Sequence, residues 1–118
     1  LKGRVHGLEE NFIVNEAAKW KDCENPLLFE EGLEAGGVQK LADAVLQVCK
    51  GLCAVFSKNT DGSYKYAMGE KNGDLRQFTK QMNAALNGRG GGKPFFVQGS
   101  VQASEEKIRA FFAESEHI

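Results

Sequence analysis

The residues best suited to bind a ligand form one short run, NGRGGGK, at positions 87–93. Its glycines surround Arg89, and Lys93 ends the run. An ordered glycine costs roughly 0.5–1 kcal/mol relative to alanine, so we expect either an unusual, crowded backbone path or a ligand close to the main chain. Consecutive glycine N–H groups can bind an anion, and arginine and lysine would supply positive charge. The run therefore predicts a loop that binds anionic groups, with contacts from Arg89, Gly90, Gly91, Gly92 and Lys93.

The elements on either side of this run distinguish it from the common phosphate-binding loops. Those loops follow a strand and open a helix, so that the phosphate meets the positive end of the helix dipole. Here the run follows an expected helix and precedes an expected strand. The apolar face of that helix is formed by Leu75, Phe78, Met82, Ala85 and Leu86. The C-terminal end of a helix presents carbonyl groups and negative partial charge. Binding of an anion at the run would therefore depend on the glycine N–H groups and on the two cations, Arg89 and Lys93.

The polar side of the same helix extends the candidate site. Arg76, Lys80, Asn83 and Asn87 recur at steps of four, three and four residues, which aligns them along one side of a helix. Such a row of donors beside a basic loop fits the phosphate backbone of a nucleic acid. Two plainer explanations stay open. The row is an ordinary solvated face whose helix is capped by Gly88, or the glycines let the chain pass close to a neighbour.

No catalytic set and no metal site are expected. Glu30 and Glu31 are adjacent in an expected strand, so their side chains point to opposite faces and cannot share a site. Cys49 and Cys53 lack the histidine spacing of a zinc site, and their apolar positions predict small buried side chains. Several strand aromatics either stack on bases or belong to the core; these are Tyr64, Tyr66, Phe95 and Phe96.

Hydrophobic patterning indicates which elements would position these residues. Apolar residues at helical spacing predict helices near the start of the chain, over 38–49, over 75–86 and after Ser104. Short apolar or alternating segments predict strands over 27–29, 52–56 and 64–68 and from Phe95 onward, with a turn at Asp61-Gly62. The order helix–strand–helix–strand–strand–helix–strand–helix predicts an α/β fold with a small mixed sheet of about four strands and packed helices.

Length and composition are those of one ordinary domain. The chain has 118 residues, of which 42% are hydrophobic and 26% charged, and its net charge is −1. Any basic site must therefore be local. No apolar run approaches the roughly 20 residues of a membrane span, and three cysteines at no disulfide-framework spacing fit a reducing compartment. We therefore expect a cytoplasmic protein without a membrane partner.

The segment YKYAMGEKNGDLRQFTKQMNAALNGRGGGKPFFVQGS resembles the DHH-associated domain. This C-terminal module is shared by alanyl-tRNA synthetases, free-standing alanyl-tRNA editing proteins and DHH phosphoesterases. The resemblance runs from Pro26 to the end of the chain and is strongest to the editing proteins. It implies a non-catalytic module that holds tRNA for alanine, with the glycine-rich run on the nucleic-acid backbone.

The resemblance also implies that catalysis takes place in a preceding domain. In the editing proteins that domain contains zinc and removes serine or glycine from mischarged tRNA, so no cofactor is expected in this chain. The parent would be such a zinc-dependent deacylase or a full alanine–tRNA ligase. In phosphoesterase relatives a histidine typically follows the glycine run. Lys93 stands there in this chain, which argues against phosphodiester cleavage.

The resemblance divides the chain into two parts. Residues 1–25 are expected to end a linker helix from the upstream domain, and residues 26–118 to form the DHH-associated-like domain. An apolar stripe at helical spacing in the first part motivates an alternative function, in which the module packs against its upstream domain or forms a homodimer without touching RNA. The stripe consists of Leu1, Val5, Leu8 and Phe12.

Overall fold

Two strands whose residues are apolar on both faces form the centre of the fold. The structure, a computed structural model, describes residues 13–71 and 73–115. In it β2 (Leu52–Lys58) and β3 (Tyr64–Glu70) are buried along almost their whole length. The other strands are β1 (Leu27–Glu31), β4 (Gly88–Lys93) and β5 (Phe96–Val101). The sheet has five strands in the order β1-β2-β3-β5-β4. β1 and β2 pair in parallel, and all other neighbours are antiparallel.

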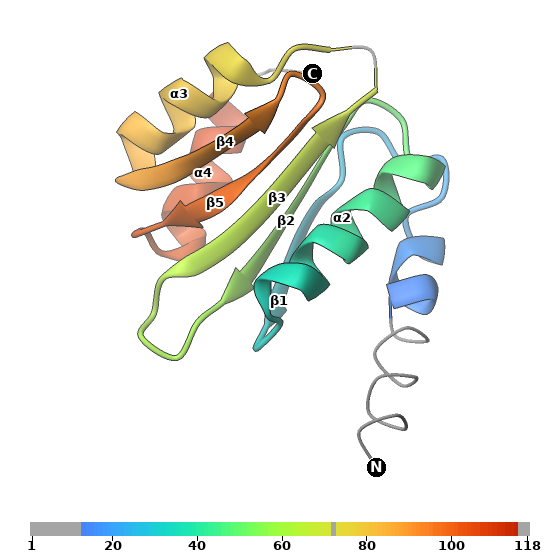
Figure 1. Ribbon diagram of the computed structural model, residues 1–118, viewed down its shortest axis with the longest axis horizontal. Helices are drawn as coiled ribbons and strands as arrows, with labels where there is room; N and C mark the ends of the chain where they lie inside the picture. The colour runs from blue at the N-terminus through green and yellow to red at the C-terminus, as the bar shows by residue number, and fades with distance from the viewer. Residues whose placement is uncertain (1–12, 72, 116–118) are drawn as a thin grey trace.

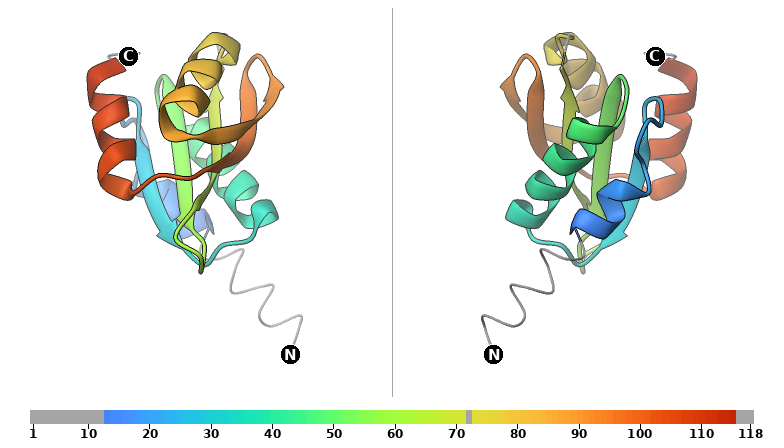
Figure 2. Two further views of the ribbon diagram at one scale, coloured as in Figure 1. Left: turned by 90° about the vertical axis from the view of Figure 1, so that its left-hand side faces the viewer. Right: turned by 90° about the vertical axis from the view of Figure 1, so that its right-hand side faces the viewer.

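Helices cover both faces of this sheet, but unevenly. Figure 1 shows α2 (Ala35–Val48) on one face, and α3 (Arg76–Leu86) and α4 (Glu105–Ser115) on the other. The two side views show the same layering (Figure 2). α2 contacts β2 and β3, whereas α3 contacts β4 and β5. The face of β4 and β5 on the α2 side is therefore less covered than the centre of the sheet.

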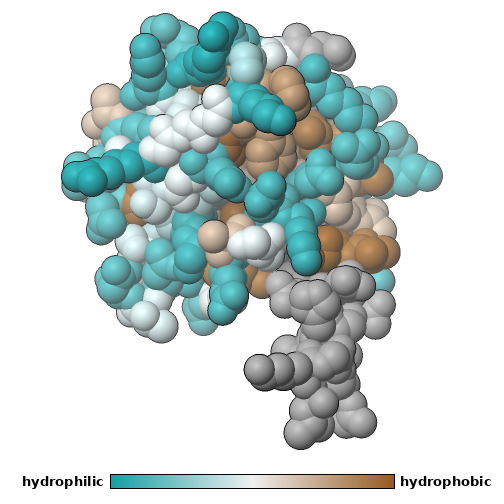
Figure 3. Space-filling model, viewed as in Figure 1, coloured by the Kyte–Doolittle hydropathy of each residue, from teal (hydrophilic) through white to brown (hydrophobic). Residues whose placement is uncertain are grey.

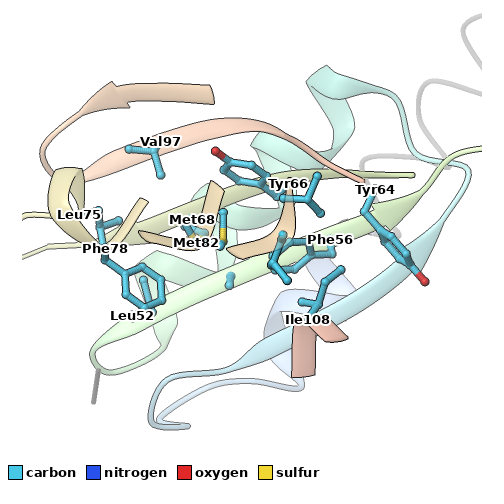
Figure 4. Packing of buried hydrophobic residues seen from close by; sticks show 13 residues of the cluster. Leu52, Phe56, Tyr64, Tyr66, Met68, Leu75, Phe78, Met82, Val97 and Ile108 are labelled. Carbon is cyan, nitrogen blue, oxygen red and sulfur yellow. The ribbon is translucent and has the colours of Figure 1, made fainter. Parts of the chain in front are cut away.

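Each face of the sheet has its own hydrophobic cluster. On the α3 and α4 side, Phe56, Tyr66 and Met68 from the central strands meet Met82 and Ile108 (Figure 4). On the α2 side, Leu41 and Val45 pack on Cys53, Val55 and Ala67. This alternation between faces is the two-residue period of a strand.

The described part of the first 25 residues packs on the α2 side. Residues 13–18 are helical, and Ile13 and Ala17 belong to the α2-side cluster. Asn25 then joins two distant segments, because its backbone N–H donates to the Lys50 carbonyl at 2.8 Å and its Oδ1 accepts from the Leu52 N–H at 2.8 Å. The boundary at residue 25 stays a prediction. The apolar stripe at positions 1, 5, 8 and 12 lies outside the described residues.

The predicted α/β class and mixed sheet are confirmed, with one correction. The glycine-rich run is not a loop before a strand; it is strand β4 itself, which raises the strand count from about four to five. Sequence patterning missed it because glycine has low strand propensity and no side chain to show alternation. Ser104 caps α4 as predicted, since its Oγ accepts from the Lys107 N–H at 3.3 Å. Among residues 13–71 and 73–115, no helix combines the length and apolar character needed to cross a membrane.

Candidate nucleic-acid interface

β4 and β5 form a hairpin at the edge of the sheet, joined by Pro94 and Phe95. In this hairpin Gly90 lies opposite Gly99, and Lys93 lies opposite Phe96. The turn is held to the domain by its own carbonyls. The Pro94 carbonyl accepts from the Leu75 N–H at 2.7 Å, and the Phe95 carbonyl accepts from the Glu70 N–H at 3.0 Å.

Close packing accounts for three of the four glycines in β4. A Cβ on Gly90 would lie 2.4 Å from the Tyr66 hydroxyl, and one on Gly92 would lie 2.6 Å from the Phe96 carbonyl oxygen. A Cβ on Gly88 would meet Val101 Cγ1 at 2.6 Å. Real Cβ atoms do not come this close to backbone or packed side chains. At these three positions glycine is therefore explained by the close approach of β4 to its neighbours, which was one of the two plainer explanations left open by the sequence.

Gly91 is different because the fold leaves its side-chain position empty. A Cβ there would meet no atom of the described residues within 4 Å. Strand alternation puts Arg89, Gly91 and Lys93 on the same face, opposite Ser100, Gln98 and Phe96 of β5. This is the less covered, α2-side face of the sheet, because Phe96 packs against the α2-side cluster. The one glycine of β4 without a packing reason thus lies between the two cations.

A groove of about 860 Å³ opens on this face, between α2 and the β4–β5 hairpin. Its floor is apolar, with Leu46 and Phe96, and the space-filling view of this side shows apolar residues framed by hydrophilic ones (Figure 3). The charged residues lining the groove are Lys40, Asp43, Lys71 and Lys93. Three cations against one carboxylate make this groove locally positive in a chain whose net charge is −1.

The predicted row on α3 lies on the opposite side of the sheet from this groove, since α3 packs on the other face. Arg76 is already paired there, with its Nη2 2.7 Å from Asp74 Oδ2, and this pairing lowers the pKa of Asp74 to about 2. Lys80 is exposed. The structure thus brings Arg89, Gly91 and Lys93 together but does not join them to Arg76 and Lys80.

The two asparagines of this row have structural positions. Asn83 accepts a hydrogen bond from the Tyr66 hydroxyl at 3.1 Å, and its Nδ2 donates to the Gly90 carbonyl at 3.5 Å. Asn87 ends α3 in the left-handed conformation, with φ of 53°, which asparagine tolerates better than most residues. Asn83 therefore holds β4 from the α3 side of the sheet. Asn87 ends α3 and redirects the chain into β4.

Sequence reasoning missed the α2 residues of the groove, together with Lys71 and Gln98, whereas it named Gly91, Gly92 and Lys93 and considered Phe95 and Phe96. Gln39, Lys40, Asp43 and Gln47 recur on the exposed side of α2, a helical spacing that looks like any solvated face. Of the aromatics considered for stacking, Tyr64 and Tyr66 are buried, whereas Phe95 is 47% exposed. The sequence signal that singles out Phe95 is its position as a large apolar residue directly after Pro94, a residue that favours turns.

Of the two cysteines predicted to be buried, Cys53 is buried and Cys49 is only half-buried. Cys53 is fully buried, its Sγ donates to the Ala42 carbonyl at 3.3 Å, and burial raises its pKa to about 12. Burial also raises the pKa of Cys49. Within the described residues, no three His, Cys, Asp or Glu side chains are grouped as a metal site would require.

Residues 10–118 match the DHHA1 domain family. The chain belongs to this family. It is 27% identical over 84 residues to the alanine–tRNA ligase of Acholeplasma laidlawii, a match that spans 71% of the chain but only 10% of that ligase. The fold is similar to the crystal structure of the C-Ala domain of Aquifex aeolicus alanyl-tRNA synthetase, with a TM-score of 0.60 and 19% identity. That likeness covers 72% of this chain and 84% of the C-Ala chain.

Proposed function

We propose that this DHHA1 domain is a non-catalytic, tRNA-binding module of a cytoplasmic alanyl-tRNA editing protein or alanyl-tRNA synthetase. Its partners would be tRNA for alanine and an upstream domain of the same protein, which in an editing protein would contain zinc and hydrolyse mischarged tRNA. The likeness to an alanine–tRNA ligase supports this proposal. The observation that carries it is the open face of β4, where Arg89 and Lys93 flank a glycine that packing does not require.

The geometry of this face suits a phosphate backbone. Alternate residues of one strand face are about 7 Å apart, so Arg89 and Lys93, two such steps apart, are separated by about 13 Å and would reach phosphates that are not adjacent in the strand. Arg89 and Lys93 would each contact a phosphate, and the empty position at Gly91 would let the backbone approach the main chain. The Gly90 and Gly92 positions would keep β4 close to β5, so that these contacts come from a rigid edge.

The test is fluorescence anisotropy of labelled tRNA for alanine against the 118-residue chain, titrated over a range of salt concentrations. Binding is expected to fall steeply with salt. The double variant Arg89→Ala/Lys93→Ala should bind more weakly and reduce the slope of log K against log[salt] by roughly 2, because about one counterion is released for each phosphate contact. Gly91→Val should weaken binding without destabilising the fold, since its side chain would occupy the approach but would collide with no described residue.

A charge-matched control is available in Lys21→Ala/Lys107→Ala. Both lysines are exposed and neither lines the groove, so this variant removes the same charge from elsewhere. It should retain most of the affinity and the salt slope. Equal losses in the two double variants would mean that only net charge matters. A separate Lys80→Ala variant tests whether the α3 side contributes as well.

A second candidate function is packing against the upstream domain or a second copy of the chain. It is favoured by two exposed large apolar side chains, Val14 at 65% and Phe95 at 47% exposure, because such residues are often buried by partners. Sedimentation of the chain over a wide concentration range tests it. Dimer formation together with no tRNA binding at low salt would replace the first proposal by this one.

A further inference from the structure

We propose that the groove between α2 and the β4–β5 hairpin receives one unpaired nucleotide of the bound RNA, with its base stacked on Phe95. This inference rests on the function proposed above and specifies the kind of RNA that the site prefers. It makes Phe95 a contact residue for a base, beside the phosphate contacts of Arg89 and Lys93.

Phe95 has the properties of a stacking platform. Its side chain is 47% exposed at the hairpin turn and lines the groove, so much of the ring is accessible to a ligand. The turn that carries it is fixed, because both of its carbonyls accept backbone hydrogen bonds from the rest of the domain, from Leu75 and Glu70. The Lys93 ammonium lies over the ring, 5.8 Å from its centroid, in a cation–π contact. A base that stacks on this face would replace the ammonium there and leave it within reach of the nucleotide's phosphate.

The other groove residues match the remaining parts of a nucleotide. Three glutamines reach it from two elements, Gln39 and Gln47 from α2 and Gln98 from β5. Amide side chains both donate and accept hydrogen bonds, as base edges require. Lys40 and Lys71 add positive charge to that of Lys93. A volume of about 860 Å³ is in the range of small-ligand sites and is ample for one nucleotide.

A base can use such a site only when it is outside a duplex. In a paired helix both faces of an internal base are stacked on its neighbours, and extrusion costs stacking and pairing energy. A loop, bulge or single-stranded end presents a free base, and stacking on an aromatic side chain tolerates every base type. The combination of an exposed ring, amides and lysines therefore favours unpaired RNA over fully paired RNA.

Two RNA duplexes test this inference. They share length, ends and sequence except that one carries a single bulged 2-aminopurine and the other pairs that base with uracil. The chain should bind the bulged RNA more tightly and change its 2-aminopurine emission. Phe95→Ala should weaken binding of the bulged RNA by about 5- to 150-fold and abolish the emission change, while affinity for the paired duplex stays the same. Phe95→Trp should restore both.

The outcomes separate this inference from the proposed function. Salt-sensitive binding of both duplexes that Phe95→Ala does not change would overturn the unpaired-base site and leave the tRNA-binding proposal intact. Binding of neither duplex, and no binding of tRNA, would overturn both. Competition with AMP distinguishes a nucleotide within RNA from a free one: if AMP binds as tightly as the bulged RNA, the groove is a site for free nucleotides and the inference is wrong. A Phe95→Ala effect on self-association alone, seen by sedimentation, would assign the side chain to a protein contact instead.

Discussion

Gly90 and Gly91 are neighbours in β4, yet their missing side chains have different consequences. At Gly90 a Cβ would collide with the Tyr66 hydroxyl and with backbone atoms of β5, and its φ of 154° is itself unfavourable for other residues. At Gly91 a Cβ would meet nothing within 4 Å. A single glycine-rich run therefore contains residues required by packing and one that is free for a ligand.

This contrast predicts opposite effects on stability. Gly90→Ala should lower the free energy of unfolding by about 1–3 kcal/mol, because it forces a new methyl group into a packed hairpin. Gly91→Ala should raise it by about 0.5–1 kcal/mol, because an ordered glycine costs about that much relative to alanine and no neighbouring atom opposes the new methyl group. Urea unfolding followed by circular dichroism measures both. Equal stability of the two variants would mean that β4 is not packed against β5 and Tyr66 as described.

At the scale of elements, α3 packs against the edge strand β4 and holds it in place. Its inner face is buried through Phe78, Met82 and Leu86, and Asn83 links it to Gly90 of β4. Thr79 is the exception on this face, because its side chain is 3% exposed and its hydroxyl, Oγ1, has no hydrogen-bond partner among the residues that the structure describes. Such a buried, unpaired hydroxyl loses its hydration without compensation.

Replacing this hydroxyl should tighten the packing between helix and sheet. Thr79→Val keeps the branched shape and removes the unpaired polar atom, so it should raise the free energy of unfolding by about 1 kcal/mol. Thr79→Ser keeps the hydroxyl and loses the methyl group, and it should be less stable than the parent. Thermal and urea unfolding would measure the two variants side by side. A destabilised valine variant would show that the hydroxyl is satisfied in solution, for instance by water.

At the scale of the whole molecule, the early helical segment is joined to the sheet through titratable groups. Burial, and then a hydrogen bond with Glu16, raise the pKa of Glu30 in β1 to about 7. Glu16 itself has a lowered pKa, chiefly through its contact with Lys19, whose Nζ lies 2.6 Å from Glu16 Oε1. Protonated Glu30 is thus the form that this junction between residues 13–18 and β1 prefers.

The stability of the domain should depend on pH for this reason. A carboxyl group whose pKa is raised on folding stabilises the fold below its unfolded pKa, and this contribution is lost as pH rises through its folded pKa. For Glu30 the loss runs from about pH 4.5 to about pH 7. Glu30→Gln should therefore be more stable than the parent at pH 8 and differ little at pH 4.5. Urea titrations at the two pH values measure this, and a constant difference between the proteins would exclude Glu30 as the titrating group.

Much of the fold follows from local patterns in the chain. The helical stripes that became α2 and α3, the apolar strand β2 and the hairpin around Asp61-Gly62 were all predictable, because each periodicity or turn signal is contained within about a dozen residues. Ser104 as a cap is equally local. The candidate cations Arg89 and Lys93 could be named for the same reason, since their setting among glycines is visible in seven consecutive residues.

Local patterns in the chain are enough to establish the α/β class, the order of its main elements and the unusual concentration of glycines around two cations. The tertiary structure alone decided that the glycine run is a strand, that α3 lies behind it, and that α2, Lys71 and Phe95 share a groove with its open face. It also distinguished Gly91 from Gly90. The physical reason is that strand pairing and packing contacts join residues distant in the chain, and glycine has no side chain through which a local pattern could reveal its partner.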